Sequence, residues 1–170
     1  EMMKKITFFW SLVLLTSLTL SAKEIFIEPS DNSQEEVQTA LIELSSGDIL
    51  TLSPGTFVFE DGLSLDVDEV IVRGSGMDET ILDFKNQMSG AQGLLVTSDR
   101  VTLKDFAVTD AKGDAIKVIG AEGINMINLK TEWTGGPKTT NGAYGLYPVE
   151  STDVLIDGCV AIGASDAGIY

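Results

Sequence analysis

The sequence predicts an all-β solenoid, in which short strands wind into stacked coils. The first observation is a motif of apolar, variable, apolar residues that occurs four times. Each copy is followed, after one variable position, by Gly, Asp or Asn: 70–72 before Gly74, 101–103 before Asp105, 124–126 before Asn128 and 154–156 before Gly158. These residue types tolerate a positive φ most readily, so we expect a sharp bend after each short strand.

The second observation is another motif that keeps step with the first. Its four copies are Gly93-Leu94-Leu95, Ala115-Ile116-Lys117, Gly145-Leu146-Tyr147 and Gly168-Ile169-Tyr170. Equivalent positions such as Val101 and Ile124 lie 23 residues apart, and insertions over 87–92 and 134–141 lengthen two of the copies. Repeats of about 20–30 residues made of short β segments are typical of solenoids that stack one coil on the next.

The segments 101–118 and 154–170 resemble coils of the right-handed parallel β-helix proteins. That superfamily includes pectate lyases, alginate epimerases, polygalacturonases and secreted members of unassigned function. The resemblance runs from about residue 25 to residue 170 and implies a right-handed parallel β-helix. The family's catalytic residues do not carry over, because the sequence has no His and neither Arg73 nor Arg100 is expected to meet an acidic cluster. The catalytic residues, if there are any, stay unknown.

Residues 1–22 have the pattern of a secretory signal peptide. Lys4 and Lys5 precede an apolar run over 6–20, and Ala22 offers a small residue for cleavage. The run is shorter than the roughly 20 residues that a membrane span needs. We therefore expect a secreted or periplasmic protein, free of the membrane after cleavage, with one β-helix domain over 23–170.

The domain is expected to open with a strand over 25–27 and a helix that covers the first coil. Ser33 and Glu36 form a capping-box pattern, and Val37, Ala40, Leu41 and Leu44 follow at helical spacing. Gly47 is expected just past the end of the helix. Such a helix would cover the apolar cross-section and unpaired edge of the coil beneath it.

Strands are then expected over 49–52, 57–59 and 63–67, followed by the repeated coils. Their inward residues should form three aliphatic rows, because like positions of parallel coils stack about 4.8 Å apart. The rows are Val70/Val101/Ile124/Val154, Val72/Leu103/Met126/Ile156 and Leu94/Ile116/Leu146/Ile169. Cys159 is expected in the core, in register with Phe106 and Leu129. Because the last strand reaches Tyr170 without a cap, the β-helix is expected to be truncated and to continue beyond residue 170.

The charge of the chain excludes some partners and leaves a metal open. With a formal net charge of −15, nucleic acid and anionic membranes are not expected to bind. A single Cys excludes an internal disulfide framework. Asp110, Asp114, Glu132 and Asp166 fall near one side of consecutive coils, where they could hold Ca²⁺. In so acidic a chain they equally fit solvated corners, and we assign no metal site or cofactor.

The candidate binding residues are Tyr147, Tyr170, Trp133 and Lys117. If Leu146 and Ile169 point inward, Tyr147 and Tyr170 point outward and stack in neighbouring coils. Lys117 lies one coil earlier in the same outward row, where it is available to a carboxylate, and Trp133 precedes the polar insertion. We therefore expect a platform for polysaccharide. The alternatives are a lyase or epimerase of uronic-acid polymers, with catalytic coils beyond residue 170, and a non-catalytic envelope scaffold or maturation protein.

Overall fold

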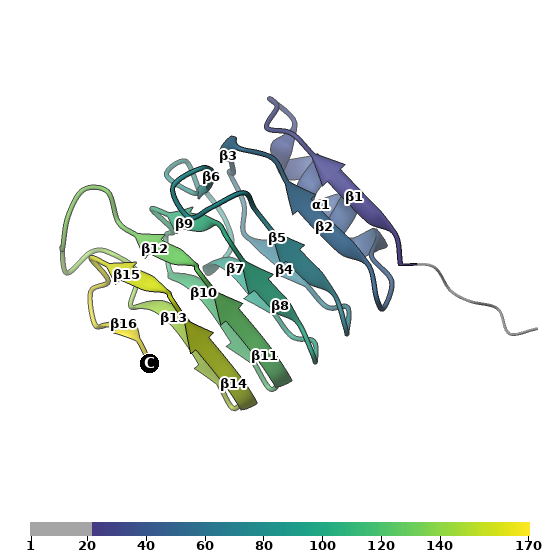
Figure 1. Cartoon of the computed structure of the whole chain (residues 1–170). Coiled ribbons are helices and arrows are strands. Elements are labelled where there is room, and N and C mark those ends of the chain that lie inside the picture. The colour runs from purple at the N-terminus through teal and green to yellow at the C-terminus, as the bar shows by residue number, and fades with distance from the viewer. Residues whose placement is uncertain (1–21) are drawn as a thin grey trace, which may run out of the picture.

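The computed structural model describes residues 22–170, so the expected signal peptide lies, apart from Ala22, outside the described residues. The described chain winds into a parallel β-helix with three sheets (Figure 1). Every strand pairs in parallel with the equivalent strand one coil away. The predicted fold class is confirmed. Within residues 22–170, no helix is long and apolar enough to cross a membrane.

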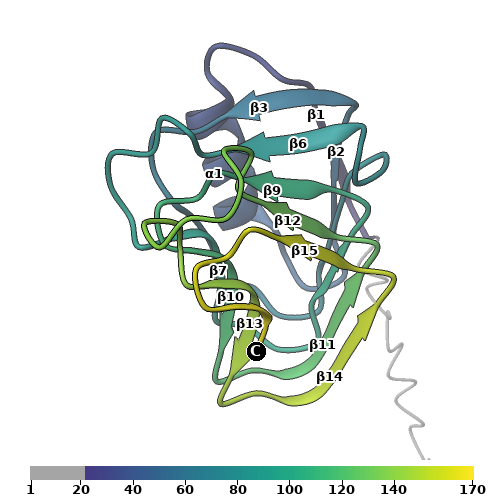
Figure 2. The same cartoon turned by 90° about the vertical axis from the view of Figure 1, so that its left-hand side faces the viewer.

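The three sheets form the three walls of the β-helix (Figure 2). The first sheet has six strands, in the spatial order β1 (Glu24–Ile27), β2 (Ile49–Leu52), β5 (Ile71–Arg73), β8 (Thr102–Lys104), β11 (Glu122–Ile127) and β14 (Thr152–Asp157). The second has five: β15 (Val160–Ile162), β12 (Lys130–Glu132), β9 (Ala107–Thr109), β6 (Thr80–Asp83) and β3 (Gly55–Val58). The third also has five: β16 (Ala167–Ile169), β13 (Tyr144–Val149), β10 (Asp114–Ile119), β7 (Gln92–Val96) and β4 (Leu63–Leu65).

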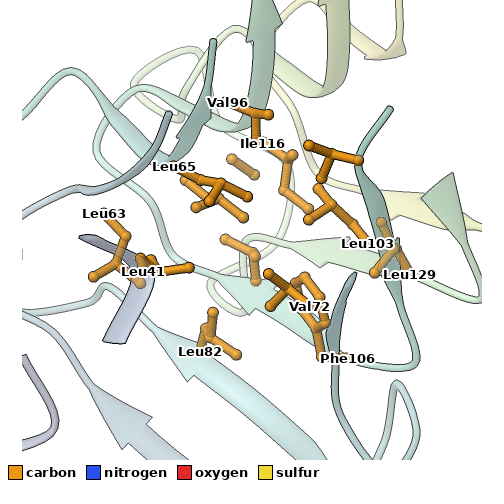
Figure 3. Packing of buried hydrophobic residues seen from close by; sticks show 14 of the residues in the cluster. Leu41, Leu63, Leu65, Val72, Leu82, Val96, Leu103, Phe106, Ile116 and Leu129 are labelled. Carbon is orange, nitrogen blue, oxygen red and sulfur yellow. The ribbon is translucent and has the colours of Figure 1, made fainter. Parts of the chain in front are cut away.

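The interior contains the three predicted rows of stacked aliphatic side chains, together with second-sheet residues such as Phe57, Leu82 and Val108. Ile116 pairs with Leu94 on one side and with Leu146 on the other, and Leu146 pairs in turn with Ile169, which is 49% exposed. In the first sheet, Met126 pairs with Leu103 and Ile156, and Ile124 pairs with Val154. Side chains from all three sheets meet in one core (Figure 3). Cys159 packs against this core but is half-buried, because it lies in the last coil.

Left-handed backbone conformations follow the first-sheet strands at three of the four predicted positions. Asp105, Asn128 and Gly158 have φ values of 60°, 49° and 64°. Gly74 is not in this region, and its missing side chain serves a different purpose. A Cβ on Gly74 would collide with the Asp105 carbonyl oxygen and the Thr80 side chain. The glycine is therefore needed for a close approach between coils rather than for its φ.

A second column of left-handed residues lies just before or at the start of the first-sheet strands, and the sequence did not reveal it. Glu69, Arg100, Gly123 and Asp153 have φ values of 60°, 54°, 73° and 50°. Each directly precedes a residue of the predicted row Val70/Val101/Ile124/Val154. Glu and Arg are not residue types that indicate φ > 0, so the sequence did not predict the left-handed conformation at Glu69 and Arg100.

The helix α1 (Ser33–Glu43) caps the N-terminal end and buries Val37, Ala40 and Leu41 against the first complete coil. The expected capping box is wrong in detail, because Ser33 is already helical and Asn32 is the N-cap. The Ser33 hydroxyl instead exchanges hydrogen bonds with the backbone of Ser30 at 2.9 and 2.8 Å. Gly47 does not end the helix either. Leu44 is the C-cap, and Gly47 turns the chain toward β2 with φ 93°.

Asp48 ties the start of β1 to the turn after α1. Its carboxylate accepts hydrogen bonds from the backbone N–H groups of Lys23 at 2.7 Å and Ser45 at 2.8 Å. These two bonds hold the pKa of Asp48 below its usual value, since they stabilise the ionised form. Asp48 is thus a buried acidic residue whose partners are both on the backbone.

Candidate functional site

The outer face of the third sheet brings together three of the four residues that the sequence singled out. Lys117 and Tyr147 are Cα partners in β10 and β13. Tyr170 follows Ile169, the Cα partner of Leu146, and its N–H donates to the Leu146 carbonyl at 3.1 Å. Leu146 is fully buried, so Tyr147 projects outward as predicted.

Tyr144 joins these residues, and the sequence reading missed it. Its ring centroid lies 4.3 Å from that of Tyr147 and 5.0 Å from that of Tyr170. Both Gly145 and Leu146 are buried, so the alternation of the strand breaks at this point. Tyr144 and Tyr147 therefore lie on the same side although they are three positions apart. We call Tyr144, Tyr147, Tyr170 and Lys117 the tyrosine face.

The rings do not form the simple ladder that was expected. Tyr144 and Tyr170 stack with an interplanar angle of 25°, whereas Tyr147 and Tyr170 meet edge to face at 60° with centroids 5.8 Å apart. The Cα partner of Tyr144 is Ala167, at the start of β16. Tyr170 is 68% exposed.

Charged groups surround the rings. The Lys117 ammonium lies 5.1 Å from the centroid of the Tyr147 ring, a cation–π arrangement. Burial raises the pKa of Asp114, although the nearby Lys117 ammonium opposes that effect. The nearby Asp166 carboxylate raises the pKa of the Tyr144 hydroxyl, since it favours the neutral phenol. The phenol is therefore held in its neutral form, as a hydrogen-bond donor.

Trp133 does not belong to this face, so its expected role in the platform is corrected. It is 5% exposed, and its Nε1–H donates to the Ala111 carbonyl at 2.8 Å inside the structure. A Cβ on Gly142 would meet the Trp133 ring, which shows that the chain at the end of the insertion covers the indole. Trp133 is an anchor for the insertion rather than a surface residue.

The insertion over 134–141 is fixed at both ends by polar contacts. Thr134 donates to the Asp110 carboxylate from its N–H at 2.8 Å and from its hydroxyl. The Asn141 side chain donates to the carbonyls of Gly136 at 2.9 Å and Gly163 at 2.6 Å. The loop is thus held on the coils beneath it, in keeping with a projection that leaves the stack intact.

The four acidic residues considered for Ca²⁺ have separate partners. Asp110 accepts from Thr134, and Glu132 lies 3.7 Å from the Lys130 ammonium. Asp114 and Asp166 belong to the surroundings of the tyrosine face. Over residues 22–170, no three His, Cys, Asp or Glu side chains lie close enough to share a metal ion.

Arg100 does meet acidic residues, contrary to the expectation from the sequence. Its guanidinium lies 2.9 Å from Glu69, 3.5 Å from Asp68 and 3.9 Å from Asp99. The insertion in the first coil separates Arg100 from Glu69 by 31 residues, so a 23-residue spacing did not reveal the pair. Arg73 reaches across β2 to pair with Glu24 of β1. Both arginines thus join different coils on the surface.

Comparisons with known proteins identify the fold and no family. No protein-family model and no curated protein sequence matches the chain. A solved structure titled as the alginate lyase AlyGC of family PL6 superposes with a TM-score of 0.57 at 16% identity, over 85% of this chain and 21% of the lyase. A variant of that enzyme gives 0.55 at 17% identity over the same shares.

The present chain therefore spans about a fifth of the length of the solved structures that it matches. An identity this low supports the fold alone and transfers no active site. The three parallel sheets and the superposition on these structures show that the chain is a parallel β-helix.

Proposed function

We propose that this protein binds polysaccharide on the tyrosine face. The observation that carries the proposal is the cluster of three tyrosine rings within 5.8 Å of one another on the outer face of a sheet. Aromatic rings offer flat apolar surfaces that match the apolar faces of sugar rings, and their hydroxyls offer hydrogen bonds. Rings on adjacent parallel strands form a rigid platform, because the coils beneath them are close-packed.

The comparisons support a polysaccharide as the ligand class. The two solved structures described above are alginate lyase structures by title, so alginate belongs in the first set of ligands to be tested. Export through the expected signal peptide would place the protein where such polymers occur.

A second candidate function is lysis or epimerisation of uronic-acid polymers, and the same structural likeness favours it. The tyrosine face offers less for that chemistry than for binding. A tyrosine must be ionised to act as a general base, and the Asp166 carboxylate disfavours the ionised form of Tyr144. Binding is therefore the function that the described residues support best.

The test is a calorimetric titration of the purified protein with alginate oligosaccharides and with neutral oligosaccharides. Tyr147→Ala should weaken binding of the recognised sugar by about 3- to 10-fold, which corresponds to the usual free-energy contribution of one aromatic contact. Tyr147→Phe should retain most of the affinity, because it retains the ring. Phe26→Ala is the matched control, because Phe26 is a 70% exposed aromatic residue on β1, in the cap at the opposite end of the fold.

Thermal melting of each variant separates a loss of contact from a loss of fold. Unchanged affinity in a well-folded Tyr147→Ala protein would overturn the proposal. So would the absence of binding by the whole set of sugars.

A further inference from the structure

We infer that the tyrosine face recognises a neutral polysaccharide rather than a polyuronate, an inference that rests on the proposed function and narrows it. The argument is electrostatic. It depends on which charges lie beside the rings and on whether the one ammonium among them is available to a ligand.

Lys117 is the only cationic side chain in the described strands of the third sheet. Its ammonium lies over the Tyr147 ring and close enough to Asp114 to oppose the rise in the pKa of that carboxyl group. It thus already lies over a π face, and Asp114 on the same strand partly offsets its charge. A ligand carboxylate would compete with both.

The carboxylates beside the rings outnumber the ammonium. Asp114 opens β10, three positions before Lys117, and the Asp166 N–H donates to the carbonyl of Ala143, the neighbour of Tyr144, at 3.1 Å. One positive and two negative groups leave this surface with an excess of negative charge. The whole chain adds to it, with a formal net charge of −15. A polyuronate carries one negative charge on each sugar, so it meets repulsion from the face and from the protein as a whole.

A neutral sugar uses the same groups favourably. Carboxylates accept hydrogen bonds from pairs of sugar hydroxyls, and phenol hydroxyls can both donate and accept. The rings stack against the apolar faces of the sugars, and a neutral sugar brings no charge of its own to this acidic surface. The rings and the two neighbouring carboxylates therefore have partners in a neutral polysaccharide, whereas the same two carboxylates oppose a uronate.

The decisive ligands are a β-1,4-linked mannose hexamer and a β-1,4-linked mannuronate hexamer. They share ring shape and linkage and differ at C6, which carries a hydroxymethyl group in one and a carboxylate in the other. At about 20 mM salt, where charges are weakly screened, calorimetry should show the mannose hexamer binding at least about tenfold more tightly. The ratio should shrink at about 500 mM salt, because screening weakens the repulsion.

Two variants test whether the local charge sets the preference. Asp166→Asn removes one negative charge beside Tyr144. It should therefore lower the ratio of the affinity for the mannose hexamer to the affinity for the mannuronate hexamer. Asp31→Asn changes the net charge by the same amount at an exposed residue next to the helical cap, and it should leave the ratio closer to that of the wild type.

The outcomes separate this inference from the function on which it rests. Equal or tighter binding of the mannuronate hexamer at low salt would overturn the neutral preference and leave polysaccharide binding intact. A ratio that Asp31→Asn narrows as much as Asp166→Asn would overturn the role assigned to the charges beside the rings. Failure of both hexamers and of the wider set of sugars to bind would remove the proposed function and this inference together.

Discussion

The register of β10 decides whether the tyrosine face exists, and a pair of neighbouring substitutions tests it. Ile116 is 0% exposed and stacks between Leu94 and Leu146, whereas Lys117, one position later, lies on the outer surface. A shift of one residue would exchange their environments and turn Tyr147 inward. Ile116→Ala and Lys117→Ala therefore probe the inner and the outer face at the same place in the same strand.

The magnitudes follow from what each side chain touches. Removing three buried carbon atoms from Ile116 leaves a cavity that coils on both sides prevent from closing, at a cost of about 2–5 kcal/mol. At roughly 2–4 °C per kcal/mol for a protein of this size, the melting temperature should fall by about 4–20 °C. Lys117→Ala removes an exposed cation–π contact of about 0.5–1 kcal/mol and should lower it by about 1–4 °C.

Thermal melting followed by circular dichroism measures both variants under one condition. Ile116→Asp extends the series, because an unpaired buried charge should prevent folding altogether at that position. Equal shifts for the two alanine variants, or a larger shift for Lys117→Ala, would refute the register and with it the position of the tyrosine rings.

Further predictions concern the cap, a corner, the buried indole and catalysis. Gly74→Ala should lower the melting temperature, because a Cβ there collides with the Asp105 carbonyl oxygen. An unchanged melting temperature would contradict this close approach between coils. The lowered pKa of Asp48 means that its carboxylate stabilises the fold fully above about pH 4 and less as the pH falls toward the folded-state pKa. Asp48→Asn should thus reduce stability at pH 7 and flatten the acid end of a stability–pH curve, and an unaltered curve would contradict this. Trp133→Phe should destabilise the protein by about 1–3 kcal/mol, through loss of its buried hydrogen bond, with no change in sugar affinity; a selective loss of affinity would return the indole to the binding face. Incubation with alginate should yield no ultraviolet-absorbing unsaturated uronate, and the appearance of that product would establish a lyase.

The fold could be predicted because its information is local and repeated. A strand in a solenoid buries every second residue, and equivalent positions of neighbouring coils stack on one another. The rows through Val72, Ile124 and Ile116 could therefore be predicted from the spacing of apolar residues. The bends at Asp105, Asn128 and Gly158 could be predicted because those residue types tolerate φ > 0. The outward direction of Tyr147 followed from the inward direction of Leu146 by the same alternation. Lys117 followed in the same way from its place one coil earlier.

The remaining features depend on contacts that have no constant spacing. Tyr144 joins the other rings because two consecutive residues, Gly145 and Leu146, both turn inward, and alternation cannot anticipate that break. Trp133 is buried because the end of the insertion closes over it, which depends on the path of a loop. Arg100 reaches Glu69 across 31 residues because an insertion lengthens that coil.

The sequence alone therefore determined the coil, its three rows and one outward column of side chains, since these repeat with the strand and the period. The tertiary structure alone decided which rings meet, which aromatic residue is buried and which charges surround the face. Corners and insertions bring those groups together, and their geometry is set by the packing of neighbouring coils rather than by any residue's own preference.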